Sequence, residues 1–123
     1  MAASPADGRR FTVDVRPMGD AVVLVLTGEL DHDTAEPLSA ALGAALTDGV
    51  PRLVVDFSEL LFCDSTGLNV LLHSRLAVQE AGGTLELAGL RRPVARMFHI
   101  TGADEIFRVH PDVAHALAEQ RPA

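Results

Sequence analysis

The segment Asp64-Ser65-Thr66-Gly67 places a carboxylate and two hydroxyls where an apolar strand pattern gives way to an apolar helix pattern. Oxygen-bearing side chains at such a boundary cap the free N–H groups of the first helical turn. A hydroxyl there is also exposed, rigidly held and close to N–H groups that can satisfy an added phosphate. The residues alone predict a helix cap, and they are compatible with a second role for Ser65 as a phosphorylation site.

A second segment of interest is acidic: it contains Glu29, Asp31 and Asp33, and it also follows an apolar strand pattern. A phosphate on Ser65 would carry about −1.5 to −2 charges at neutral pH, close to this segment if the two loops adjoin. Acids just before a helix can instead complement its dipole without contacting any partner. We assign that structural role mainly to Asp33, which forms an apparent capping box with Glu36, and we assign partner binding to Asp31.

A serine hydrolase is the main enzymatic alternative. Its nucleophile elbow requires glycine two positions before and two positions after the serine, whereas this chain has Cys63 and Gly67 there. None of the five histidines has a visible relation to Ser65, and His110 and His115 are misaligned for metal binding on one helix face. The single cysteine is expected to be a small buried apolar residue. We therefore expect no enzymatic activity, no metal site and no cofactor.

Strands are predicted from two kinds of apolar pattern. Residues 11–16 alternate apolar and polar side chains, as in a half-exposed edge strand, and a turn leads into the continuously apolar run 21–26. Continuous β-branched runs are typical of strands covered on both faces. The residues between the third strand and Asp64 are interpreted as a loop. The predicted strands are residues 11–16, 21–26, 53–55, 84–88 and 106–109.

Helices are predicted from apolar residues at helical spacing and from stop signals. The first follows the acidic segment, and Pro37 leaves its start open between the capping box and the proline itself. The second runs from about Ser65 to Ala81 and ends at a Gly-Gly pair. A third begins at Pro93, and a terminal helix follows Pro111. The side chains expected to be buried by the second and third helices are Leu68, Leu71, Leu72, Leu76, Val94, Met97, Phe98 and Ile100.

The alternation of strands and helices predicts an α/β fold. We expect a mixed, mostly parallel sheet of four to five strands with flanking helices, and an antiparallel edge from the N-terminal hairpin. With 123 residues, of which 48% are hydrophobic, the chain is expected to form one domain with an aliphatic core. Residues 1–10 are poor in apolar side chains and are expected to form a flexible tail, which places the domain at 11–121.

Charge and cysteine content limit the expected partners and location. A formal net charge of −7 opposes the phosphate backbone, so DNA and RNA are not expected as partners. No apolar run approaches the roughly 18 residues needed to span a bilayer, and no membrane partner is expected. One cysteine and no apolar leader at the N-terminus suit a reducing cytoplasm. An acidic surface with a transient partner suits a monomer when the protein is free.

Two motifs at suitable separation resemble the STAS-domain family of anti-sigma factor antagonists, of the bacterial sporulation and stress-response type. Asp64-Ser65-Thr66-Gly67 is similar to the family's phospho-acceptor loop, which reads Asp-Ser-Ser/Thr-Gly before an apolar helix. Residues 26–35 (LTGELDHDTA) resemble its acidic loop between the central strand and the first helix. The resemblance extends over residues 11–109 and includes the segments 81–83, 93–98 and 101–102.

This resemblance implies a STAS-like fold and a partner switch without catalysis. Ser65 would be phosphorylated by an anti-sigma factor that is itself an ATP-dependent serine kinase, and a PP2C-type phosphatase would reset it. The unphosphorylated protein would bind the kinase and free a sigma factor, and phosphorylation would abolish binding. Thr66, which stands in place of a second serine, is the fallback phosphosite. The residues expected at the docking surface are Glu29, Asp31, Asp64, Ser65, Thr66 and Gly67.

Two alternatives remain open from the sequence. A STAS domain that does not switch, serving as a subunit of a transport or signalling assembly, would have the same fold and is the stronger of the two. The serine hydrolase is the weaker. Phosphorylation assays and partner capture distinguish a switch from a subunit that does not switch.

Overall fold

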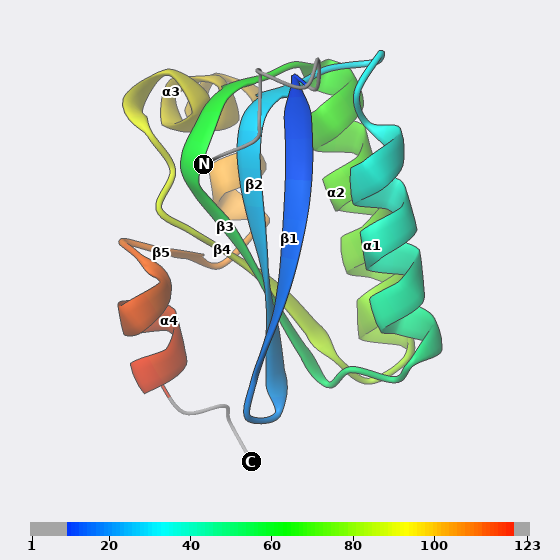
Figure 1. Cartoon of the computed structure of the whole chain (residues 1–123). Coiled ribbons are helices and arrows are strands. Elements are labelled where there is room, and N and C mark those ends of the chain that lie inside the picture. The colour runs from blue at the N-terminus through cyan, green and yellow to red at the C-terminus, as the bar shows by residue number, and fades with distance from the viewer. Residues whose placement is uncertain (1–9, 120–123) are drawn as a thin grey trace.

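The chain folds around a five-stranded sheet with strand order β1-β2-β3-β4-β5 (Figure 1). The computed structural model describes residues 10–119, so most of the predicted tail at 1–10 and the end of the predicted domain lie outside the described residues. The strands are β1 (Phe11–Met18), β2 (Ala21–Leu30), β3 (Arg52–Cys63), β4 (Thr84–Ala88) and β5 (Val109–His110). The helices are α1 (Glu36–Thr47), α2 (Ser65–Glu80), α3 (Arg92–Thr101), the 3-10 turn η2 (Ala103–Glu105) and α4 (Val113–Ala118).

The first two strands form the predicted antiparallel hairpin, whereas the other neighbouring strands are parallel. The hairpin turns at Gly19, whose φ of +69° suits glycine, so β1 continues through Met18 instead of ending at residue 16. Parallel neighbours require a crossover, and α1 and α2 supply the crossovers from β2 to β3 and from β3 to β4. The prediction of a mixed, mostly parallel sheet is confirmed.

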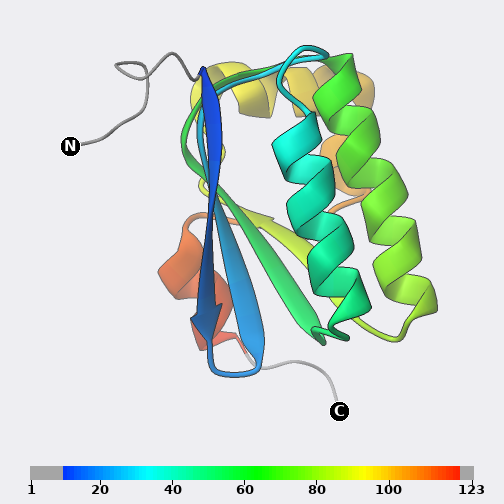
Figure 2. The ribbon, with the colours of Figure 1, turned by 45° about the vertical axis from the view of Figure 1, so that its right-hand side comes forward.

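Helices cover the two faces of the sheet unequally. α1 and α2 lie side by side on one face, and α4 lies on the opposite face (Figure 2). Successive strand residues point to opposite faces, so Leu53 joins the main core while Val54 joins a smaller cluster under α4. Both faces of the central strands are therefore covered, which explains their continuous apolar runs. The smaller cluster consists of Val23, Val54, Ala88 and Ala116.

The buried stripes of α2 and α3 are narrower than predicted. Leu76 and Ile100, both expected in the core, are 53% and 72% exposed. At about 100° per residue, Leu76 lies about 140° around α2 from the buried Leu71, and Ile100 lies about 200° around α3 from the buried Phe98. Phe98 itself meets Phe57 edge to face, with ring centroids 5.8 Å apart, and this contact fixes α3 against β3.

The predicted capping box at the start of α1 is wrong. The helix begins at Glu36 after Ala35, and no side chain caps its N–H groups. Asp33 lies too far before the first turn to act as its cap. Pro37 is in the first turn, where its missing N–H leaves no intrahelical hydrogen bond unmade, so the helix needs no restart at the proline.

The predicted loop before Asp64 is also wrong, because β3 continues to Cys63 as a strand of 12 residues. Its pairing with β2 shifts register between Val25 and Thr27, and again between Gly28 and Glu29. Each shift inserts an extra residue into β3, which is the definition of a β-bulge. Buried side chains then no longer alternate strictly, and this irregular spacing is what made the segment resemble a loop.

The last strand is shorter and later than the predicted 106–109. β5 pairs with β4 only at Leu87 and Ala88, and residues 106–108, between η2 and β5, are not in a strand. Ile106 is exposed and lies outside any strand. The terminal helix expected after Pro111 is present as α4, which Asp112 caps by accepting a hydrogen bond from the N–H of His115 at 2.8 Å.

A buried charged cluster lies beneath α4 and was not predicted. Glu86, only 6% exposed, accepts hydrogen bonds from Arg52 Nε at 2.9 Å and Nη2 at 2.8 Å, and its Oε1 lies 2.8 Å from His110 Nε2. Arg52 also donates to the carbonyl oxygens of Ala116 at 2.5 Å and Glu119 at 3.2 Å. The cluster therefore ties β3, β4 and β5 to the C-terminal end of α4.

Candidate functional site at the start of helix α2

Asp64 is the N-cap of α2, as the sequence predicts. Its backbone is extended, and its Oδ1 accepts a hydrogen bond from the N–H of Gly67 at 3.0 Å. Ser65 is the first helical residue and is exposed, and Thr66 is half-buried. Within residues 10–119 no side chain, histidines included, hydrogen-bonds to the Ser65 hydroxyl. The hydroxyl is therefore open to solvent beside the N–H groups of a helix N-terminus.

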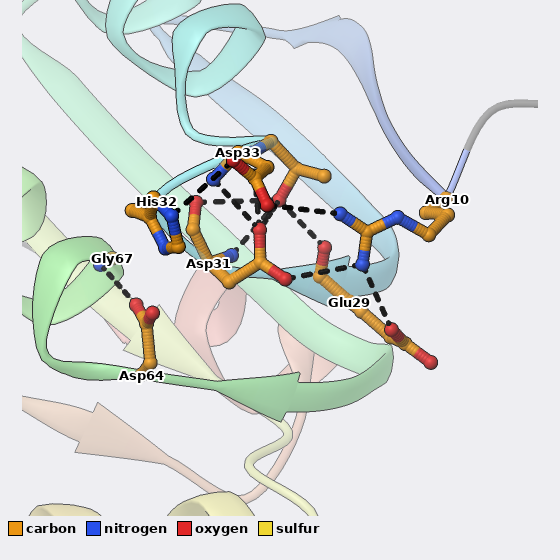
Figure 3. A network of polar contacts seen from close by, with 8 residues as sticks. Arg10, Glu29, Asp31, His32, Asp33, Asp64 and Gly67 are labelled. Carbon is orange, nitrogen blue, oxygen red and sulfur yellow. Dashed lines mark hydrogen bonds and ion pairs between the residues drawn. The ribbon is translucent and has the colours of Figure 1, made fainter.

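The acidic segment (residues 29–34) and the switch segment (residues 64–67) adjoin. The N–H of Asp64 donates to the carbonyl of Leu30 at 3.1 Å, and Leu30 pairs with Cys63 in the parallel register of β2 and β3. Figure 3 shows Asp64 and Gly67 beside the loop that carries Asp31. A charge added at Ser65 would thus be close to the carboxylates of both segments.

Gly67 is buried and permits this close approach. A Cβ at this position would lie 2.7 Å from the side chain of Leu30 and 3.0 Å from Cys63 Sγ. Side-chain atoms do not tolerate such distances without movement. Among the residues expected at the docking surface, Gly67 therefore shapes the surface from below and does not present a side chain to it.

Asp31 organises its own loop. Its Oδ1 accepts hydrogen bonds from the N–H groups of Asp33 at 2.9 Å and Thr34 at 3.1 Å, and its side chain is 18% exposed. Partial burial alone would raise the pKa of Asp31. The opposite effect is larger, because the carboxylate accepts hydrogen bonds from the N–H of Asp33, from Arg10 and from Thr34, and the pKa of Asp31 is lowered. Asp31 is therefore held as a carboxylate. Asp31 therefore has a structural role in the loop, whereas Asp33, to which a structural role was assigned from the sequence, is exposed.

Arg10 is a site residue that the sequence analysis missed. Its Nη1 lies 3.3 Å from Glu29 Oε1 and 3.1 Å from Asp31 Oδ2, and its Nη2 lies 3.9 Å from Asp33 Oδ2 (Figure 3). The hydrogen bonds to Asp31 and the neighbouring carboxylates raise the pKa of Arg10. One feature of the sequence could have indicated this contact. Arg10 directly precedes the first strand of a hairpin, and the second strand ends beside acidic residues, so the hairpin brings them together.

Gly28 allows Arg10 to reach the acidic segment. Its φ is +102°, and a Cβ there would lie 2.0 Å from the carbonyl oxygen of Arg10. The same carbonyl accepts the N–H of Glu29 at 2.9 Å. A residue with a side chain would clash with this carbonyl and strain the backbone, so Gly28 sets the position of Arg10 over the carboxylates.

Cys63, the residue before the cap, is buried as predicted. Burial, and secondarily the neighbouring Asp64 charge, raise the pKa of its thiol to about 12. A thiol with this pKa is protonated at neutral pH and is a poor nucleophile.

Leu61 and Phe62 are two further residues that sequence reasoning left without a role. They lie in β3 directly before its last residue, Cys63, and their side chains are 58% and 49% exposed. Both were attributed to a loop, in which exposure needs no explanation. In a strand, two consecutive exposed apolar residues are unexpected, because successive side chains point to opposite faces.

Neither a metal site nor a membrane-spanning helix is present within residues 10–119. This part of the chain contains no group of three or more His, Cys, Asp and Glu side chains placed to hold a metal ion. None of its helices combines the length and the apolarity that crossing a membrane requires.

The chain belongs to a known family. A family model described as "Mlab, STAS domain" matches residues 4–111, and the chain belongs to this STAS family. The anti-sigma-F factor antagonist RsfB of Mycobacterium tuberculosis is 31% identical over 114 residues, which cover 90% of each chain. The expectation of a STAS fold is confirmed.

Solved structures of anti-sigma factor antagonists are also similar to this chain. The crystal structure of an anti-sigma factor antagonist from Mycobacterium paratuberculosis matches with a TM-score of 0.82 and 30% identity, covering 95% of this chain and 97% of that one. The anti-sigma factor antagonist SpoIIAA in its unphosphorylated form matches with a TM-score of 0.68 and 25% identity, covering 80% and 86%. The chain is therefore homologous to anti-sigma factor antagonists.

Proposed function

We propose that this protein is a phosphorylation-switched anti-sigma factor antagonist. In the unphosphorylated state it binds an anti-sigma factor that is a serine kinase, and this frees a sigma factor. Phosphorylation of Ser65 ends the binding, and a PP2C-type phosphatase restores it. The protein acts by binding and not by catalysis, and the cytoplasm is its proposed location.

The observation that carries this proposal is the placement of Ser65. Its hydroxyl is exposed at the first position of α2, and the acidic segment lies directly beside it through the hydrogen bond from Asp64 to Leu30. The N–H groups of the first turn can hold a phosphate without unfolding the domain. Support also comes from the match to SpoIIAA, whose structure was determined in a form described as unphosphorylated.

The proposed docking surface comprises Glu29, Asp31, Asp64, Ser65, Thr66 and Gly67. A phosphate adds about −1.5 to −2 charges to this surface. At an effective dielectric of about 20, each unit of that charge would repel a partner carboxylate about 5 Å away by roughly 3 kcal/mol. That energy corresponds to about a hundredfold loss of affinity, before any steric clash is counted.

The test uses the purified chain with ATP and the serine-kinase anti-sigma factors encoded in the same genome. Intact-mass spectrometry is expected to show one phosphate on the wild type and on Thr66→Ala, and none on Ser65→Ala. Calorimetry is expected to show that Ser65→Asp no longer binds the kinase.

Stoichiometric phosphate on Ser65→Ala would contradict the assigned acceptor, and normal binding by Ser65→Asp would contradict the charge mechanism. Stable capture of a transport or signalling assembly, with no phosphate transfer by any of the kinases, would indicate the STAS subunit that does not switch.

A further inference from the structure

Leu61 and Phe62 are exposed together because β3 is bulged. Gly28 pairs with Leu60 and Glu29 pairs with Phe62, so Leu61 is the extra residue of the second bulge. A bulge re-aims side chains and is a recurrent feature beside functional sites. The backbone here presents two adjacent large apolar side chains to solvent, at 58% and 49% exposure, where a regular strand would bury one of them.

This apolar pair lies within the proposed docking surface. Phe62 is the register partner of Glu29, one of the carboxylates that Arg10 contacts. It precedes Ser65 by three residues, so the two Cα atoms are at most about 11 Å apart. A partner that covers both Ser65 and Glu29 is therefore within reach of Phe62.

The charges of the surface are largely engaged within the molecule. The carboxylate of Asp31 accepts hydrogen bonds from its own loop, and that of Asp64 accepts the N–H of Gly67. Glu29 and Asp33 are the exposed carboxylates of the acidic segment. In protein interfaces, apolar anchors near the centre supply most of the affinity, and charges at the rim mainly affect the association rate and the choice of partner.

We propose that Leu61 and Phe62 are the apolar anchor of the docking surface, and that the partner, the serine-kinase anti-sigma factor, offers an apolar pocket to them. This inference rests on the proposed function and names the chemistry of its partner. It also deepens the account of the switch. A phosphate three residues from a buried Phe62 would have to lose water inside the same interface, which penalises docking in addition to any charge repulsion.

The experiment measures binding of the kinase that phosphorylates the wild type, using calorimetry with Phe62→Ser and Leu61→Ser. Each variant is expected to weaken binding by about tenfold or more. The matched control is Ile100→Ser on α3, which removes an apolar side chain that is 72% exposed, and it is expected to change affinity by less than about twofold. Circular dichroism checks that each variant is folded.

Oxidative footprinting of the wild type, with and without kinase, provides a second measurement that needs no substitution. Phe62 and Leu61 are expected to be protected from oxidation in the complex, whereas Ile100 is expected to remain unprotected.

If the wild type binds but Phe62→Ser binds equally well and Phe62 is not protected, the proposed anchor is wrong and the proposed function stands. If the wild type binds no kinase, both are wrong. A dimer in light scattering that Phe62→Ser dissociates would identify a second copy as the occupant and overturn the inference.

Discussion

The molecule contains two arginine–carboxylate clusters, and they differ in burial. Arg10 holds the acidic segment at the surface, where its side chain and that of Glu29 are each about half exposed. Arg52 holds Glu86 under α4, where both side chains are almost fully buried. The same pair of chemical groups therefore has two different consequences. The buried cluster is a fixed part of the fold, whereas the exposed cluster can exchange its partners with water, salt or another protein.

The largest expected effect is the loss of the buried carboxylate. Glu86→Ala leaves the Arg52 guanidinium buried without its bidentate partner, and removal of one member of such a pair costs about 3–5 kcal/mol. Urea denaturation measures the free energy of unfolding. Glu59→Ala is the matched control, because Glu59 is an exposed glutamate of the sheet, and it is expected to be nearly neutral. A Glu86→Ala protein as stable as this control would show that the cluster contributes nothing.

The buried cluster also predicts how stability depends on pH. Burial alone would raise the pKa of Glu86, but hydrogen bonds from Arg52, His110 and Thr84 outweigh it and lower the pKa of this carboxyl. The contribution of Glu86 is therefore complete above the ordinary glutamate pKa of about 4.3, and it is lost as the pH falls through the lower folded-state value.

Unfolding free energies measured between neutral and acidic pH are expected to fall less steeply for Glu86→Gln than for the wild type. Equal slopes would contradict the lowered pKa.

An intermediate effect is expected where the two segments of the switch site meet. Gly67→Ala introduces a methyl group 2.7 Å from Leu30, and overpacking of this kind costs about 1–3 kcal/mol. Gly43→Ala is the matched control in α1, because its added Cβ would meet nothing within 4 Å, and it is expected to stabilise by about 0.5–1 kcal/mol. Thermal melting followed by circular dichroism compares the two. A stabilised Gly67→Ala protein would show that Leu30 and Cys63 can move aside.

The smallest effect on stability is expected at the exposed cluster. Arg10→Gln removes the cation that faces three carboxylates, and the loss of stability should be smaller than that caused by Gly67→Ala. Because exposed charges are screened, the difference from the wild type should disappear at high ionic strength. Denaturation at low and high salt tests this. A difference that persists in high salt would mean that Arg10 acts through packing and not through charge.

Local patterns predicted the parts of the fold that depend on local chemistry. Apolar periodicity located the helices and the starts of the first four strands, and the change from strand to helix pattern at Asp64 located both the cap and the exposed Ser65. The features that could not be predicted arise from tertiary contacts. The bulges of β3 depend on its pairing with β2, and the burial of Glu86 depends on Arg52, which is 34 residues away in the sequence. Arg10 reaches the carboxylates of the acidic segment only because Gly28 has no side chain to clash with the Arg10 carbonyl oxygen.

The central claim is that the charge state of one hydroxyl decides whether the partner binds. Calorimetry can compare the unphosphorylated protein with protein fully phosphorylated at Ser65, each titrated with the same serine-kinase anti-sigma factor. We expect the phosphorylated form to bind at least about a hundredfold more weakly. Equal affinity of the two forms would contradict the switch.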